Sequence, residues 1–207
     1  MTQDVREALY RRAKACYDHR ANESDVIEAE GLFRQLRDYA DAPAFVEKCE
    51  MLRRFAVGKS VEFGKGLSWR VVDERGRMRL LFAEADVSHR AYHDELRDTS
   101  WGQCSLRQWL NHDFLEQFFT PQERARMISS VVRNRRSPKF FTNAGENTVD
   151  KVFIPDLGEV CRYLPSETDR AGEGWWWLRT PGCNLLSVAS VYTDGSIYET
   201  GIHVNYA

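Results

Sequence analysis

The residues of this chain with nucleophilic, acid–base or metal-binding potential are scattered and form no recognisable catalytic motif. They are Cys16, Cys49, Cys104, Cys161, Cys183, His19, His89, His93, His112 and His203. A nucleophilic cysteine or serine needs a base held beside it, and no motif links a histidine to such a nucleophile. No Cys-x-x-Cys pair indicates a zinc site or a redox site. We therefore expect no catalytic residue, no metal and no cofactor.

Two histidines, His89 and His93, stand four positions apart, which is the spacing that places two side chains on one face of a helix. A zinc site needs a third protein ligand, and none stands at a recognisable spacing from this pair. We expect a pair of surface histidines and not a metal site.

The segment "RNRRSPKFF" (residues 133–141) concentrates four cations beside two aromatic residues. Arginine forks bind phosphate and aromatic rings stack on bases, so contact with phosphate or nucleic acid is one interpretation. A solvated loop is the other, and we favour it because the rest of the chain carries no basic face.

The composition is that of a soluble globular protein, with 43% hydrophobic and 29% charged residues among 207. The N-terminal segment is charged throughout, unlike a signal peptide, and no apolar stretch approaches the roughly 20 residues that span a bilayer. The net charge of −2 creates no overall field toward nucleic acid or an anionic membrane. We expect a cytoplasmic protein with neither as a partner.

Residues 2–56 have the apolar spacing of amphipathic helices, and we expect three of them. Ser24 is the expected cap of the second helix and Asp41 of the third. The apolar stripes are Leu9, Ala13, Cys16 and Tyr17; Ile27, Ala29, Leu32, Phe33 and Leu36; Phe45, Cys49, Leu52 and Phe55. This helical module (residues 1–56) resembles a single tetratricopeptide-like unit. One unit buries little surface alone, so it should dock on the rest of the chain or on a partner.

After Gly58 the pattern becomes that of an α+β domain over residues 57–207. The segments "SVEFG", "LSWRVVD" and "RMRLLFAEA" predict an antiparallel meander. Helices are expected over "CSLRQWLNHDFLEQFF", "TPQERARMI" and "PDLGEVCRYL", the second starting with a capping box of Thr120 and Glu123. Residues 134–150 predict a polar loop and "KVFIP" a short strand. The tail predicts strands over "WWWLR", "VASVYT", "SIYE" and "IHVNY", with turns at "DG" and "TG".

Three segments carry a resemblance: "SLRQWLNHDFLEQFFTPQERARMI", "DKVFIPDLGEVCRYL" and above all "WWWLRTPG…VYTDGSIYETGIHVNYA". Over residues 57–207 the chain resembles a bacterial domain family of uncharacterised function whose members have the pattern "S-LR-WLN--F", "D-VFLLS", "WWLRSPG…V…DG….G..V". That family is similar to the C-type-lectin-like fold of formylglycine-generating enzymes. The resemblance implies a C-type-lectin-like domain behind the helical module.

The chain departs from that pattern in ways that disfavour two specialised activities. The redox cysteine pair of the enzymatic relatives has no counterpart, because Cys161 and Cys183 are far apart in sequence. The Glu-Pro-Asn and Trp-Asn-Asp clusters of calcium-dependent lectins are absent. "TPG" replaces the commoner "SPG". The "GVRPAL"-like segment that usually follows the last strand is missing at Ala207, which leaves the pairing of the final edge in question.

A third use of the fold is as the variable protein of a diversity-generating retroelement, in which adenine mutagenesis rewrites C-terminal codons. Asn codons changed at their adenines cannot give Trp, Gln, Glu, Lys or Met. Between Gly182 and Ala207, Glu199 is the only residue of those five types. The alternative is that short strands and turns are poor in Lys, Gln and Met in any protein.

Our leading hypothesis is a non-catalytic binding protein whose partner is a protein or a small ligand. Tyr, Asn, Ser and His offer rigid amphipathic area with adaptable hydrogen bonds. The expected ligand-binding surface is the set Cys183, Asn184, Leu185, Leu186, Ser187, Ser190, Tyr192, Tyr198, His203, Asn205 and Tyr206, with Val188, Val191, Ile197, Ile202 and Val204 assigned to packing. The expected structural frame behind it is Trp175, Trp176, Trp177, Arg179, Pro181 and Gly182.

Two rival hypotheses remain open. An enzyme related to the formylglycine-generating group would need Cys183 as a reactive thiol, so thiol reactivity separates it from a binding protein. A structural adaptor would act through the helical module, and separate pull-downs with residues 1–56 and 57–207 would reveal that.

Overall fold

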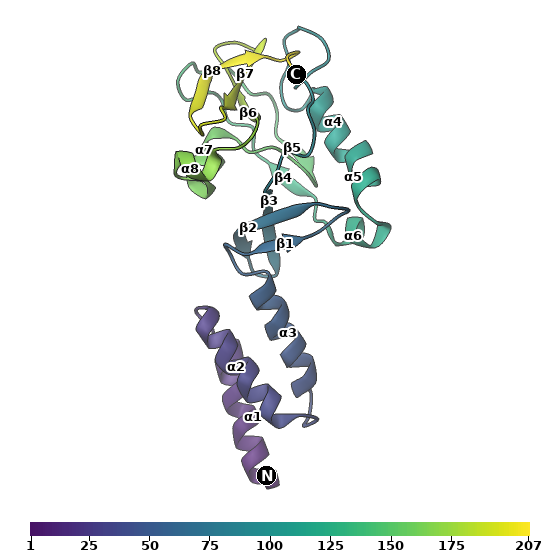
Figure 1. Cartoon of the computed structure of the whole chain (residues 1–207), viewed down its shortest axis with the longest axis vertical. Helices are drawn as coiled ribbons and strands as arrows, with labels where there is room; N and C mark the ends of the chain where they lie inside the picture. The colour runs from purple at the N-terminus through teal and green to yellow at the C-terminus, as the bar shows by residue number, and fades with distance from the viewer. The chain divides into compact units, whose positions relative to one another are not determined.

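The structure, a computed structural model, describes all 207 residues as three N-terminal helices followed by small antiparallel sheets and short helices (Figure 1). This confirms the α+β class. None of the helices combines the length and the apolar character that crossing a bilayer requires. The helices are α1 Gln3–Asp18, α2 Glu23–Leu36, α3 Ala42–Arg54, α4 Ser105–Asn111, α5 Asp113–Phe118, α6 Pro121–Arg126, α7 Leu157–Tyr163 and α8 Glu167–Arg170. The strands are β1 Ser60–Glu62, β2 Ser68–Arg75, β3 Met78–Ala83, β4 Ser130–Val132, β5 Thr148–Asp150, β6 Trp176–Pro181, β7 Ser187–Val191 and β8 Ile197–His203.

The chain divides into two compact units. Unit 1 comprises residues 1–61 and 69–82, and unit 2 comprises residues 62–68 and 83–207. The three helices thus group with most of the sheet β1-β2-β3, which is the expected meander. A domain boundary after residue 56 stays a prediction.

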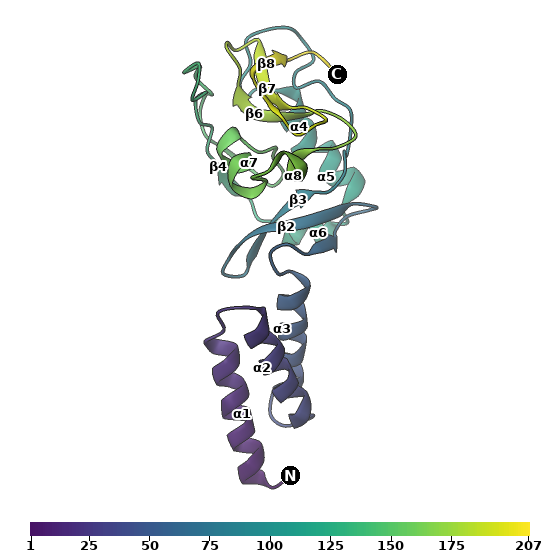
Figure 2. The same cartoon turned by 60° about the vertical axis from the view of Figure 1, so that its left-hand side comes forward.

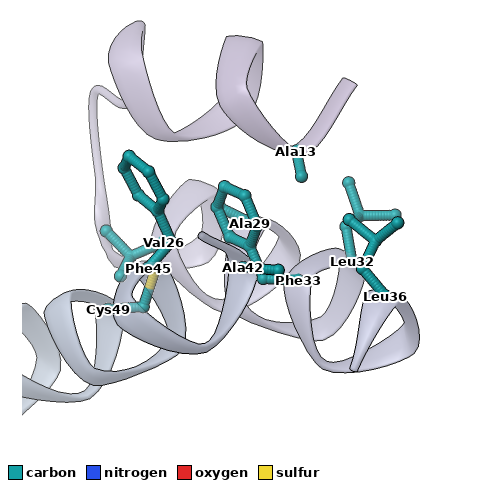
Figure 3. Close-up of a cluster of buried hydrophobic side chains, with 9 residues drawn as sticks. All are labelled: Ala13, Val26, Ala29, Leu32, Phe33, Leu36, Ala42, Phe45 and Cys49. Atoms are coloured by element: carbon teal, nitrogen blue, oxygen red, sulfur yellow. The ribbon is translucent and has the colours of Figure 1, made fainter. Parts of the chain in front are cut away.

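The core of the three helices is one apolar cluster (Figure 3). Phe33 of α2 and Phe45 of α3 stack with ring centroids 4.8 Å apart, and Ala13 is the residue of α1 that is fully buried against them. Short side chains such as Ala13, Ala29 and Ala42 let the helices approach closely, while the rings fill the space between them. The cluster consists of Ala13, Val26, Ala29, Leu32, Phe33, Leu36, Ala42, Phe45 and Cys49.

Two details of these helices correct the sequence prediction. The N-cap of α2 is Asn22 and not Ser24: its side chain accepts from the Asp25 N–H at 3.1 Å, and the Asp25 carboxylate accepts from the Asn22 N–H at 3.2 Å. Ile27, placed in the apolar stripe, is 48% exposed, and Val26 is buried in its place because it lies on the side of α2 that faces the cluster.

Asp41 stands at the N-cap position of α3, but its side chain does not cap the helix. Its carboxylate accepts a hydrogen bond from the Tyr10 hydroxyl instead. This bond raises the pKa of Tyr10 to about 12, because the neutral phenol is the donor that the carboxylate needs. Asp41 thus joins α1 to the start of α3.

Three further predictions concern the segment between β3 and β6. The single helix expected over "CSLRQWLNHDFLEQFF" is broken at His112, whose dihedrals (φ −126°, ψ −87°) are not helical, so α4 and α5 are separate. The capping box of Thr120 and Glu123 at α6 is confirmed. The strand expected over residues 151–155 is wrong: β5 comes just before it and pairs with β4, Val131 opposite Val149.

The C-terminal sheet is antiparallel with the order β6-β7-β8 (Figure 2). The expected turn at "TG" is wrong, because β8 continues through Thr200 and Gly201. The register shifts between Val188 and Ser190, whose partners are Ile202 and Tyr198, so β8 takes up extra residues as a bulge. Gly201 has φ +92° there, a conformation that favours glycine.

Candidate functional site

Three consecutive tryptophans, Trp175 just before β6 and Trp176 and Trp177 at its start, divide between the two faces of the C-terminal sheet. Trp176 packs with Leu178 and with Val160 of α7, which covers one face (Figure 2). Trp177 is buried on the opposite face, where its ring lies 4.7 Å from that of Trp175. Successive strand residues point to opposite sides, so one face is closed by α7 and the other carries Trp175 and Trp177.

Arg179 ties β6 to the beginning of α7. Its guanidinium binds both carboxylate oxygens of Glu159, at 2.7 and 2.9 Å, and lies 3.4 Å from the Asp156 carboxylate. It also donates to the carbonyl oxygens of Ile154 and Arg133. The side chain is 1% exposed, so this pairing compensates a buried charge. Arg179 therefore fixes the C-terminal sheet to α7, as a member of the structural frame.

The turn after β6 depends on the absence of a side chain at Gly182. A Cβ there would lie 2.3 Å from the Thr200 carbonyl oxygen and 2.6 Å from the Ser187 hydroxyl. The Gly182 N–H donates to the Ser187 carbonyl at 2.8 Å, and the Gly182 carbonyl accepts from the Thr142 hydroxyl at 2.8 Å. The turn is thus held to β7 on one side and to the loop before β5 on the other.

The face opposite α7 carries four partly exposed aromatic rings, Trp175, Tyr192, Tyr198 and Tyr206, which we call the aromatic face. Tyr198 is paired across the sheet with Ser190, which is itself paired with Trp177, so these residues share a side. The rings of Tyr192 and Tyr198 stack 5.4 Å apart, and that of Tyr206 lies 5.9 Å from Trp175. Tyr192, Tyr198 and Tyr206 are 38%, 37% and 58% exposed.

The predicted ligand-binding residues fall into two groups along the C-terminal sheet. Tyr192, Tyr198 and Tyr206 belong to the aromatic face. A second group surrounds the β6–β7 turn, at the far end of β7, where Ser187 pairs with His203. Ser187 and Ser190 are 5% and 0% exposed, so neither presents its hydroxyl to a partner. The turn group is Cys183, Asn184, Leu185, Leu186, His203 and Asn205, of which Cys183, Asn184, His203 and Asn205 are exposed.

Sequence reasoning placed Trp175 in the frame, whereas the structure leaves it half-buried on the aromatic face. Strand alternation puts Trp175 on the side of Tyr192 and Tyr198 once the register is known, and the sequence does not supply that register. Asn184 is exposed, but its side-chain oxygen already accepts from the Leu186 N–H at 2.9 Å, which shapes the turn.

His93 is buried, whereas the sequence predicted that it and His89 form a pair of surface histidines. His89 is exposed, but His93 is 6% exposed and accepts from the Ser105 N–H, and no helix joins the two. No group of three or more His, Cys, Asp or Glu side chains is arranged to hold a metal. Burial raises the pKa of Cys104 to about 12, so this thiol stays protonated at neutral pH. Cys161 and Cys183 are exposed.

The basic segment lies in the loop between β4 and β5 (Figure 2). Ser137 closes its tip, donating its N–H to the Thr142 carbonyl at 3.0 Å and accepting from the Phe141 N–H at 2.9 Å. Phe141 is 70% exposed and has φ +58°. Arg136 and Lys139 are exposed, as expected of a solvated loop, but the loop is bonded internally rather than open.

The C-terminal part of the chain matches the model of a known protein family. Residues 77–207 match the model of a family described as "Domain of unknown function (DUF6273)", which is well over half of the chain. The chain belongs to the DUF6273 family. The DUF6273 match contains every candidate binding residue and excludes the helices α1–α3. The searches of curated proteins and of solved structures give no significant match.

Proposed function

We propose that the DUF6273 domain of this chain is a non-catalytic binding module that recognises a protein or ligand with its aromatic face. The observation that supports this most directly is the set of four aromatic rings on the side of the C-terminal sheet opposite α7. Tyrosine and tryptophan rings provide large, rigid and amphipathic contact area, and such residues dominate the energetics of protein interfaces.

Tyr198 lies in β8, the other three rings flank the ends of β6, β7 and β8, and β6 and β7 are held in place independently of a partner. The ion pair of Arg179 with Glu159 fixes β6, and a buried cluster joins α7 to Leu178 and Val191. A site anchored by an ordered sheet loses little conformational entropy on binding, which favours affinity. The aromatic face is therefore preorganised for binding.

The finer assignments belong to the same proposal. The motif order "WLRTPG…DG" supports a C-type-lectin-like scaffold, and the residue types after Gly182 support a retroelement-diversified tail. A reverse transcriptase gene beside an Asn-rich near-copy of the tail-coding segment would establish the second assignment. Without such a neighbour, the binding surface is a fixed one.

Replacing Tyr192, Tyr198 and Tyr206 together with Ala should abolish partner binding and leave the fold intact, because each ring is more than a third exposed. The measurement is capture of cellular proteins by the full chain and by the triple variant, with circular dichroism as the check on folding. The triple variant should capture the partner at least about tenfold less than the unaltered chain does. Each aromatic interface residue contributes about 1–2 kcal/mol or more to binding.

The matched control is the double variant Val131→Ala, Val149→Ala, which removes two exposed apolar residues, 69% and 61% exposed, from the β4-β5 ribbon. It should capture the same partner as the unaltered chain. A triple variant that still captures the partner would show that the aromatic face is not the binding surface.

A further inference from the structure

A second candidate site is a groove of about 330 Å³ formed by α4, α5 and the segment before α4. This volume is at the lower end of small-molecule sites in proteins. The break at His112 turns the chain between the two helices, and His112 and Asp113 both line the groove there. Arg90 and Asp94 line it from the preceding segment, with Trp109 of α4. None of these residues belongs to the aromatic face.

The groove contains charges of both signs that have no partner in the protein. The guanidinium of Arg90 lies over the Trp109 ring, 4.3 Å from its centroid, and makes no ion pair or hydrogen bond. The carboxylates of Asp94 and Asp113 also make none. The backbone is fixed nonetheless: the Arg90 carbonyl accepts from the Trp177 indole N–H at 3.0 Å, and the Asp94 N–H donates to the Ser105 hydroxyl at 3.1 Å.

We propose that this groove binds a small zwitterion of the α-amino acid class. Arg90 would receive the carboxylate with the free edge of its stacked guanidinium, because that fork matches carboxylate geometry. Asp94 and Asp113 would receive the ammonium group. The apolar part of the ligand would contact Trp109 and Leu106, which also lines the groove.

Other small ligands fit this charge pattern less well. Two carboxylates repel a phosphate dianion, and Arg90 repels a diamine. A neutral sugar would satisfy hydrogen bonds but would leave all three charges without a counter-ion. A zwitterion pairs with both signs at once, and the groove of about 330 Å³ has charges of both signs in its lining.

The test is a thermal-shift and calorimetric titration of the full chain with each of the twenty common amino acids, together with inorganic phosphate, glucose and putrescine. At least one amino acid should raise Tm in proportion to the logarithm of its concentration, as ligand linkage requires. The exposed contacts suggest a Kd on the order of 0.1–1 mM. The N-acetyl derivative and the carboxamide of the same amino acid, each lacking one charge, should bind at least tenfold more weakly, a loss of about 1.4 kcal/mol.

Matched variants locate the site. Arg90→Gln and the double variant Asp94→Asn, Asp113→Asn should each weaken binding at least about tenfold, since each removes one of the two charge pairs. Arg136→Gln and Asp98→Asn, which alter exposed charges outside the groove, should bind as the unaltered chain does. All five positions are exposed, so the variants should fold.

Three results would overturn the proposal. The first is that no amino acid binds at millimolar concentration, whether or not phosphate, glucose or putrescine does. The second is that the N-acetyl or carboxamide form binds as tightly as the free amino acid. The third is that Arg90→Gln binds unchanged.

Discussion

Arg179 of β6 joins its strand to the start of α7 and to the carbonyl oxygens of Arg133 and Ile154. It binds Glu159 with both carboxylate oxygens and lies beside Asp156, which is 2% exposed. Replacing one member of a buried ion pair leaves the other charges without compensation. Replacing Arg179 therefore tests whether these ion pairs hold β6 against α7.

The variant Arg179→Met should lower the free energy of unfolding by about 3–5 kcal/mol, because it removes the bidentate partner of Glu159 and leaves the buried Asp156 carboxylate with only the longer ion pair to Arg135, at 3.7 Å. Urea unfolding followed by tryptophan fluorescence measures this loss. Arg179→Lys should restore only part of it, since an ammonium group does not form the bidentate pair with Glu159. An unchanged urea midpoint for Arg179→Met would mean that the ion pairs contribute nothing net to stability.

At the scale of elements, the most irregular feature is the bulge of β8 at Gly201. A Cβ at this position would lie 2.9 Å from backbone atoms of Val188, and the residue has φ +92°. An L-residue there meets both backbone strain and a steric clash. The bulge thus makes glycine necessary for two separable reasons.

The variant Gly201→Ala should lose about 2–4 kcal/mol of stability, whereas Gly66→Ala should lose about 1–2 kcal/mol. Gly66 is the matched control because it also has positive φ, +69°, but open space around its Cβ position. Urea unfolding of both variants separates strain from clash. Equal losses would contradict the bulge geometry, since they would mean that the Val188 backbone moves aside without cost.

Several elements were predictable from sequence because residues close together in the chain decide them. The capping box at Thr120 and the three amphipathic helices depend on residues within a few positions of one another. The break at His112 and the continuity of β8 through Gly201 depend on partners far along the chain. The apolar face from Leu106 to Phe118 is compatible with one helix or with two, and a "TG" pair is compatible with a turn or with a bulge.

The candidate site was predictable to the same extent and for the same reason. Residue types singled out Tyr192, Tyr198 and Tyr206, and all three side chains are more than a third exposed. They also suggested Ser190, which is fully buried, and missed Trp175 as part of the exposed face. Side assignment along a strand needs the register, and a bulge changes it.

At the scale of the whole molecule, the two compact units should respond differently to acid. Glu30 of α2, with a side chain 8% exposed, accepts from Arg34 at 2.8 Å and from Arg53 at 2.9 Å. Burial acts to raise the pKa of Glu30, but the hydrogen bonds from Arg53 and Arg34 outweigh it and hold the pKa below the ordinary 4.5. A carboxyl whose pKa is lower in the folded state stabilises that state at pH values above its pKa in the unfolded chain. This contribution is lost as the pH falls through its pKa in the folded state.

Two optical signals distinguish the units. Helices α1–α3, which are 16, 14 and 13 residues long, are the longest in the chain, so ellipticity at 222 nm reports mainly on unit 1. Of the six tryptophans, Trp69 alone lies in unit 1, so fluorescence reports mainly on unit 2. Urea unfolding at a series of pH values can therefore be followed for each unit in one sample.

We expect the Glu30→Gln variant to be less stable than the unaltered chain above pH 4.5 when ellipticity is measured, and the difference to shrink as the pH falls below that value. Fluorescence midpoints should not show this convergence, because both ion-pair partners of Glu30, Arg34 and Arg53, lie in unit 1. Glu28→Gln is the control: its ion pair with Arg12 is exposed and should change the midpoint by no more than about 1 kcal/mol. A constant difference between Glu30→Gln and the unaltered chain from neutral pH down to pH values well below 4.5 would show that the lowered pKa of Glu30 does not contribute to the stability of the three helices.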